Sequence, residues 1–151
     1  MADIAIIWDP INNRGDWSTA NGDLVTGSDL ENYVLICLFT DRVLPEDAIP
    51  PDGTDDHRGW PGDTYADLPI GSRLWTLRRK SISSVSALLS EAKDICNEAL
   101  APLLTDGLAA NVDVQTYYPS PGQLGITVTI TEPDGNVSTF KYQWAWGGVF
   151  K

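Results

Sequence analysis

The spacing of hydrophobic residues is most regular in the second half of the chain. From about residue 81 the apolar positions recur at intervals of three and four, which is the spacing of a helix that buries one face. These positions are Val85, Leu88, Leu89, Ala92, Cys96, Ala99, Leu100 and Leu103. We predict a long helix that opens at Ser81 or Ser83 and stops at Asp106-Gly107, with Pro102 kinking or ending it.

Three later segments alternate between apolar and polar residues, which is typical of strands with one buried face. They read NVDVQTYY, GITVTITE and NVSTFKYQWAW, and PSPGQ and PDG separate them as turns. This predicts a three-stranded antiparallel meander. Its last strand places Phe140, Tyr142, Trp144 and Trp146 on one face, either as core over Leu88, Leu89, Cys96 and Leu103 or as a stacking platform for sugars or bases.

Weaker patterns precede the long helix. DIAIIW is a possible short strand, and a capping box from Ser28 to Glu31 opens a helix of about ten residues that ends near Thr40. GSRLWTLRRK, from Gly71, can form a short helix. Cys37 and Cys96 both fall on apolar helical faces, which favours two buried, reduced thiols over a disulfide or a metal pair.

Together these elements predict an α+β fold. A three-stranded antiparallel meander packs on the long helix, with additional short helices and long N-terminal loops. The chain has 151 residues, of which 42% are hydrophobic, so we expect one domain that spans residues 1–151.

The charge is strongly acidic and unevenly distributed. The formal net charge is −11, which argues against nucleic acid or an anionic membrane surface as the partner and favours protein. Residues 1–70 contain 14 Asp and Glu against three Arg, whereas residues 71–151 contain seven acids and seven bases. No segment is typical of a signal peptide or a membrane span, so we expect synthesis in the cytoplasm.

The segment DDHRGWPGD, residues 55–63, has the composition of an active site but also of a binding loop. It contains the one histidine of the chain, His57, beside Arg58, Trp60 and Asp63. Its glycines and proline fix a tight path, an arginine can hold a carboxylate with two hydrogen bonds, and a tryptophan can anchor in a pocket. We therefore favour assembly over catalysis.

Other chemistries find weaker support in the same region. The chain lacks a nucleophile elbow, a set of zinc ligands and a calcium loop of regular spacing, so we expect no cofactor and no enzyme activity. The alternative that stays open is a small lysozyme-like glycosidase that uses carboxylates of the 41–67 region, because two acids across a cleft suffice for that reaction.

Four segments in fixed order resemble the Mu-like prophage baseplate protein family. They are LENYVLICLFTDR, PDGTDDHRGWPGD, IGSRLW and EALAPLLTDGLA, and the likeness extends from Trp8 to Trp146. Members of this family look related to the baseplate wedge proteins of contractile phage tails that carry a lysozyme-like name. In the wider family an acid-Pro-Arg motif marks the helix-to-sheet junction, whereas this chain has Thr105-Asp106-Gly107 there.

The resemblance implies a non-enzymatic structural subunit of the virion tail. Its partners would be other wedge subunits, the tail sheath protein and the central spike or hub. We hypothesise that an edge of the sheet, the strand from Val137 to Trp146, receives a strand from a sheath or wedge subunit. Proline at Thr139 or Gln143 would test this, and one of the two is expected to face outward. The full set of expected partner-binding residues is Arg42, Arg58, Trp60, Asp63, Val137, Thr139, Lys141 and Gln143.

Overall fold

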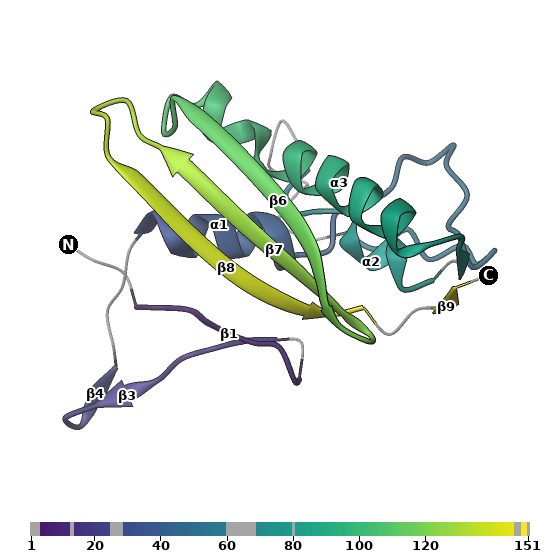
Figure 1. Cartoon of the computed structure of the whole chain (residues 1–151), viewed down its shortest axis with the longest axis horizontal. Coiled ribbons are helices and arrows are strands. Elements are labelled where there is room, and N and C mark those ends of the chain that lie inside the picture. Colours follow the sequence, from purple (N-terminus) through teal and green to yellow (C-terminus); the bar gives the residue numbers. More distant parts are fainter. Residues whose placement is uncertain are drawn as a thin grey trace.

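The computed structural model describes residues 4–12, 14–24, 29–59, 69–79 and 81–146, together with the backbone of 149–150. Its helices are α1 (Asp29–Phe39), α2 (Leu74–Leu77) and α3 (Val85–Thr105), and its main sheet has the order β6-β7-β8. The α+β prediction is confirmed: the sheet packs on α3 (Figure 1).

The sheet is an antiparallel meander of three long strands, as the alternation predicted. They are β6 (Asn111–Ser120), β7 (Gln123–Thr131) and β8 (Val137–Ala145). The even-numbered residues of the middle strand all turn toward the helices and are fully buried: Leu124, Ile126, Val128 and Ile130. The threonines on the opposite face of β7 are only partly covered.

Helix α3 begins later than the sequence predicted. Its N-cap is Ser84, whose side chain accepts a hydrogen bond from the Ala87 N–H at 3.1 Å, rather than Ser81 or Ser83. Pro102 lies inside the helix and does not end it. It stands within the last turn, where the loss of one backbone hydrogen bond is offset by the burial of Leu100 and Leu103. The stop at Asp106-Gly107 is confirmed, with Gly107 at a φ of +75°.

The aromatic stripe of β8 belongs to the core. Tyr142, Trp144 and Trp146 retain at most 7% exposure, and the Trp146 indole N–H donates to the Leu77 carbonyl at 2.8 Å. The stacking-platform alternative is therefore wrong for this face. One expected core position also needs correction: Leu88 is fully buried, whereas Leu89 is only partly buried at the margin of the core.

The two cysteines are free and buried, as predicted. Cys37 lies on α1 and Cys96 on α3. Removal from water disfavours the thiolate, so burial raises the pKa of Cys37 to about 11 and that of Cys96 to about 12. Both thiols are therefore protonated and unreactive in the folded protein.

The N-terminal loops contain four short strands that lie outside the main sheet. They are β1 (Ile7–Asp9), β2 (Arg14–Asp16), β3 (Thr19–Ala20) and β4 (Asp23–Leu24), and they pair as β1-β2 and β3-β4. The strand expected from DIAIIW is thus shorter and later than predicted, because the Ile6 N–H donates to the Asn32 side chain on α1. Ser28, the expected cap of α1, lies outside the described residues.

Two further short strands complete the described elements. They are β5 (Ser81–Ile82) and β9 (Val149–Phe150), which pair in parallel. Figure 1 places β1 beside the edge of the main sheet at β8, and β3 and β4 farther from it.

Candidate partner-binding site

The loop that follows α1 is fixed by backbone contacts to the segment before α2. Asp41 bridges Ser72, the Arg42 N–H donates to the Ser72 carbonyl, and the Ser72 N–H donates to the Thr40 carbonyl, both at 2.9 Å. This close approach requires glycine at position 71, since a Cβ atom there would lie 2.2 Å from the Thr40 oxygen. The sequence IGSRLW therefore specifies both the start of α2 and the contact between the segment before it and the loop after α1.

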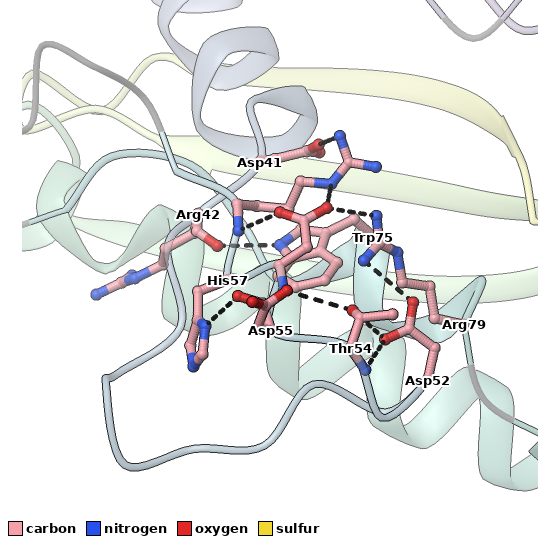
Figure 2. A network of polar contacts seen from close by, with 10 residues as sticks. Asp41, Arg42, Asp52, Thr54, Asp55, His57, Trp75 and Arg79 are labelled. Carbon is pink, nitrogen blue, oxygen red and sulfur yellow. Dashed lines mark hydrogen bonds and ion pairs between the residues drawn. The ribbon is translucent and has the colours of Figure 1, made fainter.

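Ion pairs tie the acidic part of the loop to α2 and the residues that follow it. The Arg79 guanidinium lies 3.2 Å from the Asp52 carboxylate and 3.1 Å from that of Asp56. Arg58 lies 3.5 Å from Asp56 and 3.7 Å from Asp41. Figure 2 shows this polar network, in which two arginines hold three aspartates. These pairs neutralise part of the excess negative charge of the loop.

A buried tryptophan supports both arginines. The Arg79 guanidinium lies 4.9 Å from the centre of the Trp75 ring, and that of Arg58 lies 6.0 Å from it. Such cation–π contacts stabilise a cation over an aromatic face. The Trp75 indole N–H donates to the Arg42 carbonyl at 3.0 Å, so this side chain joins α2 to the loop.

His57 fastens the loop rather than facing a cleft. Its Nδ1 lies 3.0 Å from the Asp55 carbonyl oxygen and its Nε2 lies 2.8 Å from that of Ala48. Both nitrogens can donate at once only when the ring is protonated. These two carbonyls accordingly raise the pKa of His57 above its ordinary value. A general base would need one nitrogen free to accept a proton.

Two of the three aspartates in the network, Asp52 and Asp56, have environments that do not suit acid catalysis. Hydrogen bonds from Thr54 lower the pKa of Asp52, and those from Arg58 and Arg79 lower the pKa of Asp56. Burial raises the pKa of Asp41, with Arg58 opposing it. A glycosidase acid is instead a carboxyl held neutral across a sugar cleft from a second carboxylate. Within the described residues, no group of three or more potential metal ligands is found.

A hollow of about 740 Å³ opens beside this network. Its wall combines aromatic side chains, arginines and the Asp41 carboxylate. The lining residues are Trp8, Phe39, Thr40, Asp41, Arg58, Gly59, Trp75, Arg78, Arg79 and Trp144. The Arg78 side chain is exposed and makes no ion pair with any described residue. In an acidic protein, this hollow combines a local excess of guanidinium groups with flat apolar surface, which suits a carboxylate-bearing side chain of a partner.

The second candidate surface is the edge of the sheet at β8. The Trp146 N–H donates to the Gly122 carbonyl at 2.9 Å, so even-numbered residues of β8 pair with β7 and odd-numbered ones direct their backbone groups outward. The Gln143 carbonyl, on the outward side, accepts from the Trp8 indole N–H at 2.8 Å. Thr139 and Gln143 therefore both face outward. The expectation that one of these two residues would face outward was wrong, because both do. Residues four apart in a strand direct their backbone groups to the same side.

A groove of about 570 Å³ runs along this edge. It is lined by residues 5–8 and Pro10, by Lys141, Tyr142 and Gln143 of β8, and by Glu31 and Tyr117. Trp8 stacks on Phe39 of α1 with ring centres 3.8 Å apart, and it lines both the groove and the arginine-rich hollow. The two candidate surfaces therefore adjoin each other.

The structure separates the partner-binding residues predicted from the sequence. Arg58 lies in the network, but Arg42 turns to Glu98 of α3 at 3.4 Å. Val137, Thr139, Lys141 and Gln143 are exposed on β8, whereas Trp60 and Asp63 lie outside the described residues. Sequence reasoning missed Trp75 and Arg79; the signal was the basic run Arg78-Arg79-Lys80, which follows an acid-rich loop and is the natural counter-charge for it.

Comparison with known proteins identifies one family of phage proteins and two relatives that carry the same designation. Residues 30–137 match the family described as Phage protein GP46. The chain is 40% identical over 149 residues to the Baseplate protein gp46 of Escherichia phage Mu, covering 99% of this chain and all of that protein. It is 34% identical over 149 residues to the Mu-like prophage FluMu protein gp46 of Haemophilus influenzae, covering 96% of this chain and 99% of that protein.

In the part of the chain that the structure describes, no helix is long and apolar enough to cross a membrane. The matched segment begins at the second residue of α1, includes the loop network, α2 and α3, and reaches the first residue of β8. Both relatives extend the likeness over nearly the whole chain. On these grounds the chain belongs to the GP46 family of phage proteins.

Proposed function

We propose that this protein is a structural subunit of a phage tail baseplate. The observation that carries the proposal is the 40% identity, over the full length of both chains, to a Mu protein named as a baseplate protein. Identity at this level over a whole domain supports a shared structural role. The protein would act in the assembled virion, at the end of the tail.

More specifically, we infer a wedge component of a contractile tail. Its partners would be neighbouring wedge subunits, the tail sheath protein and the central spike or hub. Two adjoining surfaces of different chemistry support such a linking role, one made of open backbone groups and the other of guanidinium and aromatic groups. A subunit that joins several partners needs more than one binding surface.

The edge of β8 would receive a strand from a partner. Val137, Thr139 and Lys141 direct their backbone groups away from β7, and an added strand would pair with them. The Gln143 carbonyl already accepts a hydrogen bond from the Trp8 indole N–H. Strand addition would therefore use the stretch from Val137 to Lys141 first.

The arginine-rich hollow would hold an acidic side chain of another subunit. Arg58 is already oriented by Asp41 and Asp56, so little side-chain entropy is lost when it binds a further carboxylate. Trp60 and Asp63 would make further contacts with the partner from the flanking segment, whereas Arg42 is directed to Glu98 of α3. The protein would have no catalytic activity, consistent with carboxylates that are engaged by arginine.

A proline scan of β8 tests the proposal. Thr139→Pro removes one outward N–H and should abolish incorporation into tails, whereas Thr139→Ala retains that N–H and should be neutral. Ser138→Pro removes an N–H that pairs with β7 and should instead destabilise the free protein. The readouts are immunogold labelling of purified tails and the melting temperature. Normal incorporation of a folded Thr139→Pro protein would exclude this edge, and absence of the wild-type protein from baseplates would exclude the proposed function itself.

A further inference from the structure

The N-terminal arm, defined here as the described residues 4–12 and 14–24, has a specified backbone but no core of its own. All the residues of β2, β3 and β4 are exposed. The turn between β3 and β4 is Asn21-Gly22, with φ values of 53° and 79°, which is the strongest short signal for a tight hairpin. The sequence therefore encodes a hairpin that buries nothing.

An isolated two-stranded hairpin is marginally stable in water, because the burial that would offset its conformational entropy is missing. Among the described residues, the contacts that attach the arm lie at its base: Trp8 stacks on Phe39 and donates to the Gln143 carbonyl, and the Ile6 N–H donates to Asn32. Beyond this base, residues 14–24 contain no buried residue, and Figure 1 shows β3 and β4 away from the sheet and the helices. A surface supplied by another molecule would provide the missing burial.

The side chains that the arm exposes are those of a binding element. Trp17 is 63% exposed and Ile11 is 86% exposed. Ile4, Ile7 and Leu24 add three more large apolar side chains that are at least 36% exposed. Tryptophan is the side chain that most often anchors a protein–protein contact, by filling an apolar pocket on the partner. Exposed apolar surface of this extent on one short segment marks an interaction site.

The charge of the arm restricts the partner. Its described residues include Asp9, Asp16 and Asp23 against Arg14 alone, a net charge of −2 (one minus three). The Arg14–Asp16 pair is long, at 3.8 Å, and both side chains are more than 60% exposed, so it neutralises little. Nucleic acid and anionic lipid would be repelled. A second copy is disfavoured by the same argument, because each copy has a formal charge of −11.

We propose that the N-terminal arm docks on a neighbouring protein subunit, inserting Trp17 into an apolar pocket rimmed by lysine or arginine, and that this contact orders the hairpin. The inference rests on the proposed baseplate function, which places such subunits next to the chain. It adds a third surface on residues 14–24, which line neither the groove along the β8 edge nor the arginine-rich hollow. It also predicts that the arm is the first part of the chain to exchange its amide protons when the protein is alone.

Hydrogen exchange compares the free protein with assembled tails. Amides of residues 14–24 should exchange at least about tenfold more slowly in tails, as expected for a segment that gains a packed interface. A carbodiimide, which joins carboxylates directly to amines, should link Asp16 or Asp23 to a lysine of a different polypeptide. Trp17→Ala and the double variant Asp16→Lys, Asp23→Lys should lower incorporation at least about tenfold with unchanged melting temperature. Asp94→Lys, an exposed acid on α3, is the matched control.

The outcomes separate the two proposals. If the wild-type protein is absent from baseplates, the proposed function fails. If it is present but residues 14–24 exchange at the free-protein rate, or Trp17→Ala incorporates normally, the arm is not a docking element. A cross-link from the arm to a second copy of this chain would overturn the chosen partner.

Discussion

The helix–sheet unit and the acidic loop after α1 are held together by different forces. The unit formed by α3 and β6–β8 buries a continuous set of aliphatic and aromatic side chains. The loop, residues 40–59, buries few side chains and is fixed by backbone contacts, ion pairs and one tryptophan. Hydrophobic burial stabilises the first region by the larger amount. The polar contacts of the second region fix where the loop lies but add little to the free energy of unfolding.

This difference indicates that the two regions have different roles in binding. A region stabilised by packing responds little to its solvent-exposed residues and can hold a sheet edge rigid. A region held by polar contacts can exchange those contacts for equivalent ones on a partner, because its carboxylates and guanidinium groups are already at the surface. Four changes, from the largest expected effect to the smallest, test how far the two regions are independent.

Leu88→Ala should cause the largest loss. Leu88 is fully buried beneath the sheet, and truncation of a buried leucine typically lowers the free energy of unfolding by about 2–5 kcal/mol. Leu89→Ala is the matched control, with a smaller loss because its side chain is only partly covered. Urea denaturation measures both. A loss below about 1 kcal/mol for Leu88→Ala would show that α3 does not form the centre of the core.

Gly71→Ala should damage the junction between the loop and α2. The new methyl group would meet the Thr40 carbonyl oxygen, and the φ of +102° is itself unfavourable for alanine. Backbone strain and forced displacement together should cost about 2–3 kcal/mol. Gly53→Ala has a φ of +76° and open space around it, so it isolates the conformational part. Equal losses for the two variants would mean that the close approach is unimportant.

The sequence predicted the first region better than the second, for physical reasons. Helix and strand periodicities report burial directly, so α3, the meander and the two buried thiols followed from spacing alone. Errors arose where a single contact decided the outcome: the Ser84 side chain caps α3, and the Asn32 side chain, 26 positions along the chain, accepts from the Ile6 N–H. The loop network depends on contacts between Asp56 and Arg79, 23 positions apart, and no local pattern encodes such pairs.

Arg79→Ala should loosen the loop with little effect on the core. It removes the ion pairs to Asp52 and Asp56 and the contact with Trp75. Because both carboxylates are partly exposed, solvent screening limits the loss to about 1 kcal/mol. Amides near Asp52 and Asp56 should exchange faster, while those of α3 should not change. Arg14→Ala, which breaks an exposed pair at 3.8 Å, should alter neither. Faster exchange throughout α3 would contradict the independence of the two regions.

The smallest expected effect is a pH dependence confined to the loop at His57. Two backbone carbonyls raise the pKa of His57 in the folded protein above its ordinary value of 6.5. A group whose folded-state pKa is raised stabilises the fold fully below its unfolded pKa, and this contribution is lost as pH rises through the folded-state value. Order in the loop should therefore decrease as pH increases from 6.5 upward through that pKa.

Amide exchange near Ala48 and Asp55, corrected for the intrinsic effect of pH, measures this change, and the His57 ring resonances report the pKa itself. His57→Gln should abolish the pH dependence, because glutamine does not titrate. The melting temperature of the helix–sheet unit should stay constant over the same range, since its core contains no group that titrates there. A His57 pKa below 6.5 would mean that the ring does not donate to both carbonyls, and the loop would then lack the fastening inferred from its geometry.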